Sequence, residues 1–381
     1  MLFRKGNWNF VRNIVFVDKN RQKYKLVASI FSPRRMGMRL RTFIIRRALL
    51  MIPTLIGVTL LIFAITQMFT PEQRAASFLS GEPRRPDVIP RIIQTHHLDD
   101  PIYIQYYHWM SRVLQGDLGF SSYSHLPVLA SLLQATPATI ELVMFAIPIT
   151  IIMGVYLGVV SAVHRDTIID HATRFLSIIG WSLPTFWLAL ILLAIFYGQL
   201  NWVSAGRLSF EQMRFVASES FTKYTGIYTI DGILNGQLWI TLDALKHLIL
   251  PVITLTIVQI ALIVRVMRSS MLEALGKGYT ILARAKGLSD DQVVNKHARR
   301  NALIPIATLS GILAAGMLTG VVITETCFNY MGLGHFAANA AMQLDIPGVL
   351  GFSLFTGIVF VIANLLVDII YVFLDPRMRL G

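Results

Sequence analysis

The sequence predicts an all-α integral membrane protein with six transmembrane helices and both termini in the cytoplasm. Three observations support this fold class: an apolar composition, six long runs almost free of charge, and an unequal distribution of lysine and arginine between the connecting segments. Hydrophobic residues make up 54% of the 381 residues, charged residues only 14%, and the mean hydropathy is +0.59. Soluble domains carry about 25% charged residues, so this chain is not built to face water on all sides.

The first run, LLMIPTLIGVTLLIFAITQMF at residues 49–69, has 21 residues and no charge. A helix of about 20 residues, rising about 1.5 Å each, crosses the roughly 30 Å hydrocarbon core of a bilayer. The run is longer than the h-region of a signal peptide, which has about 7–15 residues, and no cleavage-site pattern follows it. Comparable runs predict five further spans, at residues 142–163, 175–200, 248–264, 303–324 and 349–374.

The orientation follows from the basic residues, because lysine and arginine near helix ends are retained on the cytoplasmic side. With the N-terminus inside, the inner segments carry sixteen of these residues even without the N-terminal tail. The outer loops carry nine, spread over about twice the length. Both termini are therefore expected in the cytoplasm.

Residues 1–37 are predicted to form a basic cytoplasmic extension, with nine lysines and arginines against a single acid, Asp18. Such a segment is attracted to anionic lipid head groups by about 1 kcal/mol per charge near the surface. Docking onto a partner protein is the alternative interpretation, and the sequence does not decide between them.

The outer loops differ in length and character. Residues 70–137 form a long external loop that contains one apolar stripe at helical spacing, which predicts a helix ending near Gly116 and packing against the tops of neighbouring spans. The stripe consists of Ile102, Tyr106, Trp109 and Val113. The third loop, CFNYMGLGHFAANAAMQLDIPGVLG, is rich in glycine and is typical of a re-entrant element held against protein at membrane depth.

The motifs of nucleotide and metal enzymes are missing from the sequence. There is no G-x-x-x-x-G-K-[ST] loop for nucleotide phosphates and no H-E-x-x-H pair for zinc. The single cysteine, Cys327, cannot form an internal disulfide and is expected to be a small packing residue. We therefore expect neither catalysis nor a resident cofactor or metal site, and the sequence does not identify residues that contact a substrate.

Small residues and isolated charges within or near the spans suggest how the helices pack. GVYLG (Gly154 and Gly158) and GMLTG (Gly316 and Gly320) are small-xxx-small patterns that let helix backbones approach closely. Asp368 is expected to pair with an arginine at the inner boundary, because an ionisable group in hydrocarbon is costly. Glu141 and Glu325 are expected to be exposed charges at the outer ends of helices.

The cytoplasmic segment at about residues 265–304 is predicted to form two short helices joined by a tight turn. An apolar stripe of helical spacing precedes the turn, and it consists of Leu272, Leu275, Tyr279 and Leu282. Gly287 supplies the left-handed residue that ends a helix. Ser289 then starts the second helix as its N-cap, with Asp290 and Asp291 at the positive end of the helix dipole.

This segment, ARAKGLSDDQVVNKHARRNALIP, resembles the EAA-type loop of the permease subunits of ABC importers, in the form found in the dipeptide, oligopeptide and nickel permease family. Other stretches resemble the same family in the same order, from about Met38 to the C-terminus. They are RRALLMIPTLIGVTLLIF, GDLGFS, TPATIELV, SLPTFWLALIL, ITETCFNYMGLG and DIIYVFLDPRMR. The resemblance implies the type I ABC importer permease fold for residues 38–381.

One departure concerns the start of the loop, where the family pattern reads Glu-Ala-Ala and only Ala283 of that trio is present here. The resemblance implies that the loop sits in a cleft of an ATP-binding subunit and couples ATP hydrolysis to movement of the spans. The residues expected to make this contact are Ala283, Arg284, Ala285, Lys286, Gly287, Leu288, Ser289, Asp290 and Asp291. Lys296, Arg299 and Arg300 are expected to flank the contact near lipid head groups.

The resemblance also implies the partners of the protein and its location in the cell. They are a second permease subunit, two ATP-binding subunits that hold ATP and Mg²⁺, an extracytoplasmic solute-binding protein and lipids of a bacterial or archaeal cytoplasmic membrane, with no role for nucleic acid. Oligopeptides or dipeptides are the expected substrates, and oligosaccharides or nickel are alternatives within the class. An ion-coupled secondary transporter is the alternative from another class, but it needs carboxylates near the midplane, where the sequence places none.

Overall fold

The structure is a computed structural model, and it describes residues 40–76, 78–79 and 87–374. The predicted basic extension at residues 1–37 lies outside these residues. Within them the regular secondary structure is helical apart from a short antiparallel hairpin. Its strands are β1 (Phe120–Ser121) and β2 (Leu126–Pro127), with Phe120 opposite Pro127. The predicted all-α class is thus confirmed.

In the described part of the chain, five helices are long and apolar enough to cross a membrane. They are α3 (Leu40–Thr66), α7 (Val128–Val163), α12 (Leu238–Leu275), the continuous run of α14 (Asp290–Gln292), η2 (Val293–Ala298) and α15 (Arg299–Leu318), and α18 (Ile346–Leu374). A sixth span is present if a bent pair of helices is taken as one. Each of the six predicted runs therefore lies for most of its length on helices of this set.

The bent pair corrects the prediction of one continuous helix over residues 175–200. α8 (Ile168–Ser182) is followed by α9 (Thr185–Leu192) and η1 (Leu193–Gln199), and the two arms meet at 99°. The break lies at Leu183 and Pro184, where Leu183 is extended with φ −75° and ψ 128°. Proline lacks an N–H and disfavours helical backbone in the residue before it, so the chain turns here.

The helices differ in extent from the apolar runs, most clearly in three cases. α7 begins at Val128, so residues 128–137 of the predicted external loop are helical, and α12 extends the run 248–264 at both ends. Hydropathy detects only the part of a helix in hydrocarbon, and both helices continue beyond it. The helix of the run 303–324 instead ends at Leu318: Gly320 adopts φ +105°, and a separate short helix begins at Val322.

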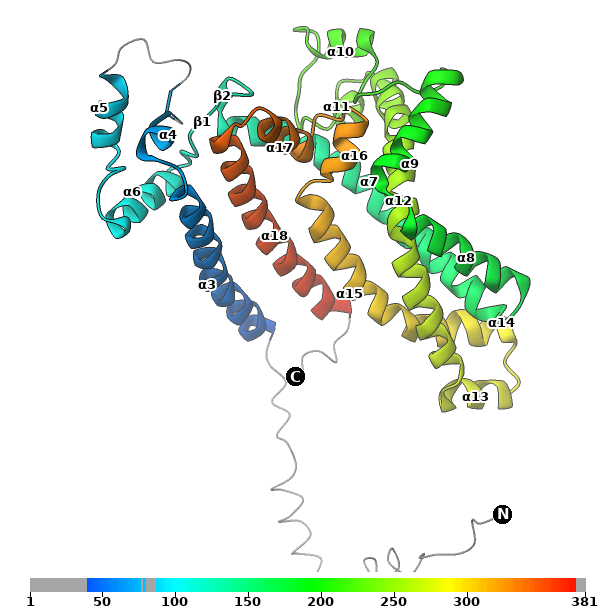
Figure 1. The fold of residues 1–381 in the computed structure, drawn as a ribbon. Helices are drawn as coiled ribbons and strands as arrows, with labels where there is room; N and C mark the ends of the chain where they lie inside the picture. The colour runs from blue at the N-terminus through cyan, green and yellow to red at the C-terminus, as the bar shows by residue number, and fades with distance from the viewer. Residues whose placement is uncertain (1–39, 77, 80–86, 375–381) are drawn as a thin grey trace, which may run out of the picture.

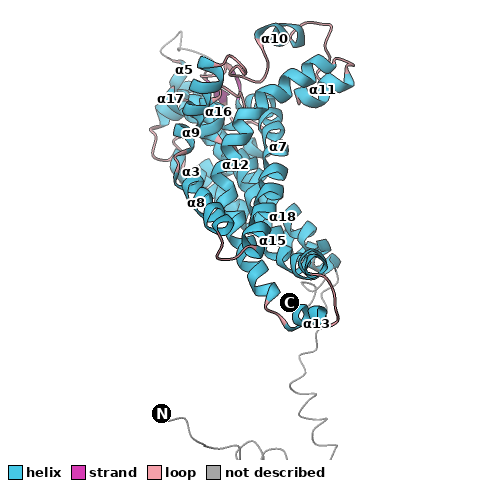
Figure 2. Ribbon diagram, turned by 90° about the vertical axis from the view of Figure 1, so that its right-hand side faces the viewer, coloured by secondary structure: helices cyan, strands magenta, loops and turns pink. Residues whose placement is uncertain are grey.

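Short helices gather at the two ends of the bundle (Figures 1 and 2). At the end where the outer loops were predicted lie α4 (Pro71–Ala76), α5 (Val88–Thr95), α6 (Ile102–Leu114), α10 (Phe210–Val216), α11 (Tyr228–Leu234), α16 (Val322–Cys327) and α17 (Leu333–Met342). α13 (Gly278–Ala285) and α14 lie at the opposite end, where α3 begins and α18 ends. The segments predicted to be cytoplasmic are therefore at one end of the molecule.

Close packing of α7 on α12 forms the centre of the bundle. A Cβ atom added at Gly154 would lie 2.6 Å from Ile263, and one added at Gly158 would lie 2.6 Å from Met267. This confirms the packing role of the first small-xxx-small pattern. In the second pattern the interpretation is wrong for Gly316, where a Cβ would meet nothing within 4 Å, but at Gly320 a Cβ would lie 3.0 Å from the backbone nitrogen of Gly334.

The long external loop packs on the top of α3 through α6, as its apolar stripe predicts. The Tyr106 hydroxyl lies 3.0 Å from the Thr59 hydroxyl, and the ring of Phe63 lies 5.2 Å from that of Tyr106. α6 ends at Leu114, and Gly116 follows with φ +83°. Ile102 departs from the prediction, since it is 65% exposed.

Candidate functional site

The turn between α13 and α14 is a Schellman motif centred on Gly287. The N–H of Gly287 donates to the carbonyl of Arg284 at 2.9 Å, and the N–H of Leu288 donates to that of Ala283 at 3.3 Å. Gly287 itself adopts φ +82°, as the sequence predicted for a residue ending a helix. A side chain there would meet no atom within 4 Å, so only the backbone conformation requires glycine.

The second helix starts as predicted, with Ser289 as its N-cap. The hydroxyl of Ser289 accepts a hydrogen bond from the N–H of Gln292 at 3.4 Å, and Asp290 and Asp291 lie in the first turn. Asp290 also accepts a hydrogen bond from Nε of Arg284 at 3.2 Å, which ties the two short helices together. Both side chains of this ion pair are exposed, so its contribution to stability is small.

The angle between α12 and α13 is held by Thr280, whose side chain is fully buried. Its hydroxyl lies 2.6 Å from the carbonyl oxygen of Lys277, 3.1 Å from that of Ala274 and 3.0 Å from that of Leu275. Ala274 and Leu275 are the last two residues of α12, and Lys277 is the N-cap of α13, so the hydroxyl bridges the break between the two helices. The loop is therefore anchored to α12 at its first turn.

The loop has a buried face and an exposed face. Ala283 and Val293 point inward and are 6% and 0% exposed. Of the nine residues expected to contact an ATP-binding subunit, Leu288 is half-buried, and the remaining seven are exposed. Those seven are Arg284, Ala285, Lys286, Gly287, Ser289, Asp290 and Asp291.

Three large apolar side chains on α13 also face outward: Tyr279, Ile281 and Leu282 are 41%, 58% and 56% exposed. The predicted single stripe through Tyr279 and Leu282 was wrong. α12 ends at Leu275 and α13 begins at Gly278, so the helical register is interrupted between the two halves of the stripe. Gly276 and Gly278 were the sequence signal for this break, because glycine weakens a helix interior.

Next to the loop, a buried ion pair joins α8 to α12. Nη2 and Nε of Arg268 donate to the two carboxylate oxygens of Asp170, at 2.7 and 2.8 Å. Asp170 is 0% exposed and accepts further hydrogen bonds from the Ser161 hydroxyl at 2.6 Å and the N–H of Asp166 at 3.1 Å. The carboxylate thus connects α7, α8 and α12, and sequence reasoning had not identified it.

At the outer end, Glu141 is not the exposed charge that the sequence analysis expected, since it is 1% exposed. Its carboxylate accepts hydrogen bonds from Nη2 of Arg207 at 2.6 Å, from the Tyr330 hydroxyl at 2.8 Å and from the N–H of Thr229 at 2.8 Å. Burial acts to lower the pKa of Arg207, but the Glu141 carboxylate together with Tyr330 and Tyr228 outweighs it, so the pKa is raised. Glu141 therefore organises the outer loops.

Glu325 is also buried, at 0% exposed, and the expectation of an exposed charge was again wrong. Its carboxylate accepts hydrogen bonds from the Thr139 hydroxyl at 2.7 Å and from the N–H groups of Gly334 and His335 at 2.7 and 3.0 Å. Burial raises its pKa, although these donors act in the opposite direction. At the inner end, Asp368 pairs with Arg47 at 3.2 Å, as predicted.

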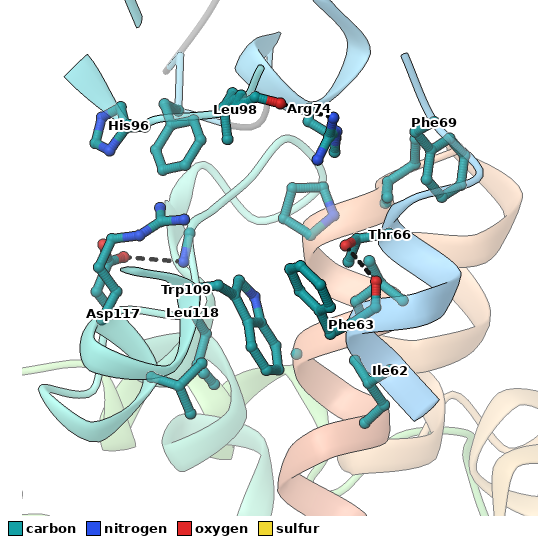
Figure 3. A pocket seen from close by; sticks show the side chains of 18 of the residues that line it. Ile62, Phe63, Thr66, Phe69, Arg74, His96, Leu98, Trp109, Asp117 and Leu118 are labelled. Carbon is teal, nitrogen blue, oxygen red and sulfur yellow. Dashed lines mark hydrogen bonds between the residues drawn. The ribbon is translucent and has the colours of Figure 1, made fainter. Parts of the chain in front are cut away.

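A cavity of about 100 Å³ lies on the outer side, between the top of α3, the helices of the long loop and the start of α18 (Figure 3). Phe63 and Trp109 face each other across it, with ring centroids 5.6 Å apart. His96 stacks on Phe78 with centroids 4.0 Å apart. Burial and the nearby Arg112 lower the pKa of His96. The aromatic side chains that line this cavity form the core of a small outer subdomain.

Comparison with known families matches almost all of the chain. Residues 154–380 match the model described as binding-protein-dependent transport system inner membrane component, and residues 40–154 match the model of the corresponding N-terminal region. The junction falls at Gly154, inside α7. The boundary between the two matches therefore falls within one continuous helix and does not separate two structural domains.

Individual relatives match at similar length. The dipeptide transport system permease protein DppB of Escherichia coli (strain K12) is 38% identical over 340 residues, covering 88% of this chain and 98% of the relative. DppB of Alkalihalophilus pseudofirmus is 37% identical over 338 residues, covering 88% and 99%. The oligopeptide transport system permease protein AppB of Bacillus subtilis (strain 168) is 32% identical over 346 residues, covering 88% and 99%.

Proposed function

The chain belongs to the binding-protein-dependent transport system inner membrane component family, and from this premise we propose that it is the subunit of an ATP-driven importer through which peptides cross the membrane. It is a multi-pass protein of the cytoplasmic membrane. Dipeptides or oligopeptides are the proposed substrates, because the relatives named above are dipeptide and oligopeptide permeases. Oligosaccharides and nickel are the alternatives within the same class.

The observation that carries the proposal is the exposed face of the cytoplasmic loop. It presents the Gly287 turn together with Tyr279, Ile281 and Leu282, whose apolar side chains protrude from a segment rich in charge. Exposed apolar side chains rimmed by polar residues mark interaction sites. We assign this face as the contact for a separate ATP-binding subunit.

The attachment of the loop explains how force on it would reach the spans. Thr280 fixes α13 to α12, and the run from α14 through η2 into α15 continues from the other side of the turn. Met271, Ala274, Ala298 and Ala302 pack into one buried cluster at the base of both helices. A close-packed contact of this kind transmits displacement because interiors are little compressible. α12 and α15 would therefore move together.

An ion-coupled carrier is the alternative from another class, and one observation favours it: the bent pair α8–α9 resembles the broken helices that line carrier sites. Against it stands Asp170, the buried carboxylate of α8, which is paired with Arg268 rather than free to bind an ion. The family membership also supports the importer.

The test is uptake by membrane vesicles that contain the full-length chain and the subunits that co-purify with it. We expect a tagged chain to retain an ATP-binding subunit, and a labelled dipeptide to enter vesicles only when ATP and the binding protein are supplied. Uptake that continues without ATP and collapses with the ion gradient would favour the carrier. Sugar or nickel uptake in place of dipeptide uptake would change the substrate but leave the importer class intact.

A further inference from the structure

A cavity of about 370 Å³ lies between α8 and α12 on the cytoplasmic side of the bundle, and its lining includes three arginines. We call it the α8–α12 arginine cavity. Its charged residues are Arg174, Arg265 and Arg268, beside two serines, and its apolar part includes Ile178, Ala261 and Val264. The cavity therefore has a strongly basic region next to an apolar one.

The basic region is not neutralised by the described chain. The charge of Arg268 is paired with Asp170, to which Arg268 donates two hydrogen bonds. Arg174 and Arg265 are exposed, and neither makes a side-chain hydrogen bond or ion pair with any described residue. Two positive charges thus face the same cavity from opposite walls, which favours an anionic occupant.

Arg174 and Arg265 lie at the same level along the antiparallel helices α8 and α12. α8 and α12 run antiparallel, since Asp170 pairs with Arg268 at one end and Gly180 packs against Ile257 at the other. The uncharged run of α12 ends at Val264, one residue before Arg265, and that of α8 begins one residue after Arg174. Both guanidinium groups therefore belong to the boundary between hydrocarbon and cytoplasm, where phospholipid head groups lie.

The apolar side of the cavity continues onto the outer surface of α8. Ile178 is 56% exposed, and its neighbours Phe175 and Leu176 are 64% and 67% exposed. A ligand that places a phosphate between the arginines would lay an acyl chain along this surface. The juxtaposition of charge and apolar surface fits an amphiphile better than a small soluble anion.

We propose that the α8–α12 arginine cavity binds the phosphate head group of an anionic phospholipid from the cytoplasmic leaflet. Guanidinium groups are suited to this ligand because they donate in a planar fork that matches phosphate oxygens. Basic pockets between transmembrane helices on the cytoplasmic side are known to hold anionic head groups. A bound lipid would bridge α8 and α12 beside the Asp170–Arg268 pair, two turns from the cytoplasmic loop.

The test measures phosphatidylglycerol binding to the purified full-length chain in detergent by native mass spectrometry. We expect the single variants Arg174→Gln and Arg265→Gln each to lose about fivefold in affinity, and the double variant about 30-fold. The control is the double variant Arg299→Gln and Arg300→Gln. It removes the same charge near the head groups on the same side of the membrane but outside the cavity, and it should lose clearly less affinity than the cavity double variant, about fivefold or less.

Competition separates the possible sources of the anion. Inorganic phosphate at matched concentration should not displace phosphatidylglycerol, because it lacks the acyl chains. Equal loss in the control variant would overturn the proposal in favour of general surface attraction. Phosphatidylglycerol binding that survives in the cavity variant, together with loss of dipeptide binding, would overturn it in favour of a cargo site. If the double glutamine variant fails to fold, the double lysine variant keeps the charge and should lose less than about fivefold.

Discussion

Arg207 donates hydrogen bonds from Nε and Nη2 to Oε2 of Glu141, 3.3 and 2.6 Å away, and so joins the second outer loop to the upper part of α7. The guanidinium also lies 4.1 Å from the ring centroid of Tyr228 and donates to the carbonyl of Gly226 at 2.9 Å. Nε and Nη2 of Arg207 and both carboxylate oxygens of Glu141 are thus hydrogen-bonded inside the protein. Breaking such a pair leaves a buried charge without compensation.

Arg207→Ala is therefore expected to destabilise the protein by about 3–5 kcal/mol, because Glu141 would stay buried without its cation. Thermal unfolding in detergent, followed by tryptophan fluorescence, measures the change. Arg214→Ala is the matched control, since Arg214 lies exposed in the same loop and should change stability by less than about 0.5 kcal/mol. Equal midpoints for the two variants would show that the buried pair has no structural role.

Gly287→Val should uncouple ATP hydrolysis from uptake while leaving the protein assembled in the membrane. A β-branched residue at φ +82° costs at least about 1–2 kcal/mol, and the turn would relax to another geometry. Uptake and ATP hydrolysis are measured on the same vesicles. Gly278→Ala in the same loop is the control, because its backbone has an ordinary φ and an added Cβ meets nothing within 4 Å. Coupled transport at the parental rate in the Gly287 variant would exclude the turn from coupling.

Ile281→Asp should weaken the retention of the ATP-binding subunit by about tenfold, as expected when an apolar contact is replaced by a charge at a protein interface. Pull-down of the tagged chain with quantification of the ATPase measures this effect. Ile233→Asp offers a close control, because Ile233 is 58% exposed, as is Ile281, but lies in α11 at the opposite end of the molecule. Similar retention by both variants would place the contact elsewhere.

The two small-xxx-small patterns should respond differently to alanine. Gly158→Ala forces a Cβ to within 2.6 Å of Met267 and should destabilise the protein by about 1–3 kcal/mol through overpacking. Gly316→Ala meets nothing within 4 Å and should stabilise it by up to about 1 kcal/mol, because alanine is the better helix former. Unfolding midpoints of the two variants test this directly. A stabilised Gly158 variant would mean that α7 and α12 can separate without cost.

The outer subdomain should lose stability below neutral pH through His96. Its pKa is lowered in the folded chain, so the unfolded chain binds the proton more readily. The contribution of His96 is complete above its unfolded pKa of about 6.5 and is lost as pH falls through the lowered value. Unfolding midpoints at pH 7.5 and 5.5 should therefore differ more for the parent than for His96→Gln. Identical pH dependence in the two proteins would contradict the assignment.

Local features of the sequence were sufficient for part of this structure. Uncharged runs of about 20 residues locate the spans because a helix satisfies its own backbone in hydrocarbon. The Gly287 turn and the Ser289 cap were predictable for the same reason, since their hydrogen bonds join residues within five positions of each other. The break at Pro184 was visible as a proline, but its 99° bend was not.

The environment of the carboxylates could not be predicted from neighbouring residues. Glu141 meets Arg207 and Tyr330 across 66 and 189 positions, and Glu325 meets Thr139 across 186. Counting along the chain placed both acids at outer helix ends, where solvent is the default partner. The outer loops fold back over these ends, so protein donors replace water.

The sequence by itself determined that the chain is a helical membrane protein, where its spans run and where its cytoplasmic turn lies, because each depends on hydropathy or hydrogen bonds within one segment. Only the tertiary structure decided which charges are buried, which glycines hold helices together and which face of α13 is left uncovered. These properties depend on what lies opposite a residue, and that is set by packing between segments far apart in the chain.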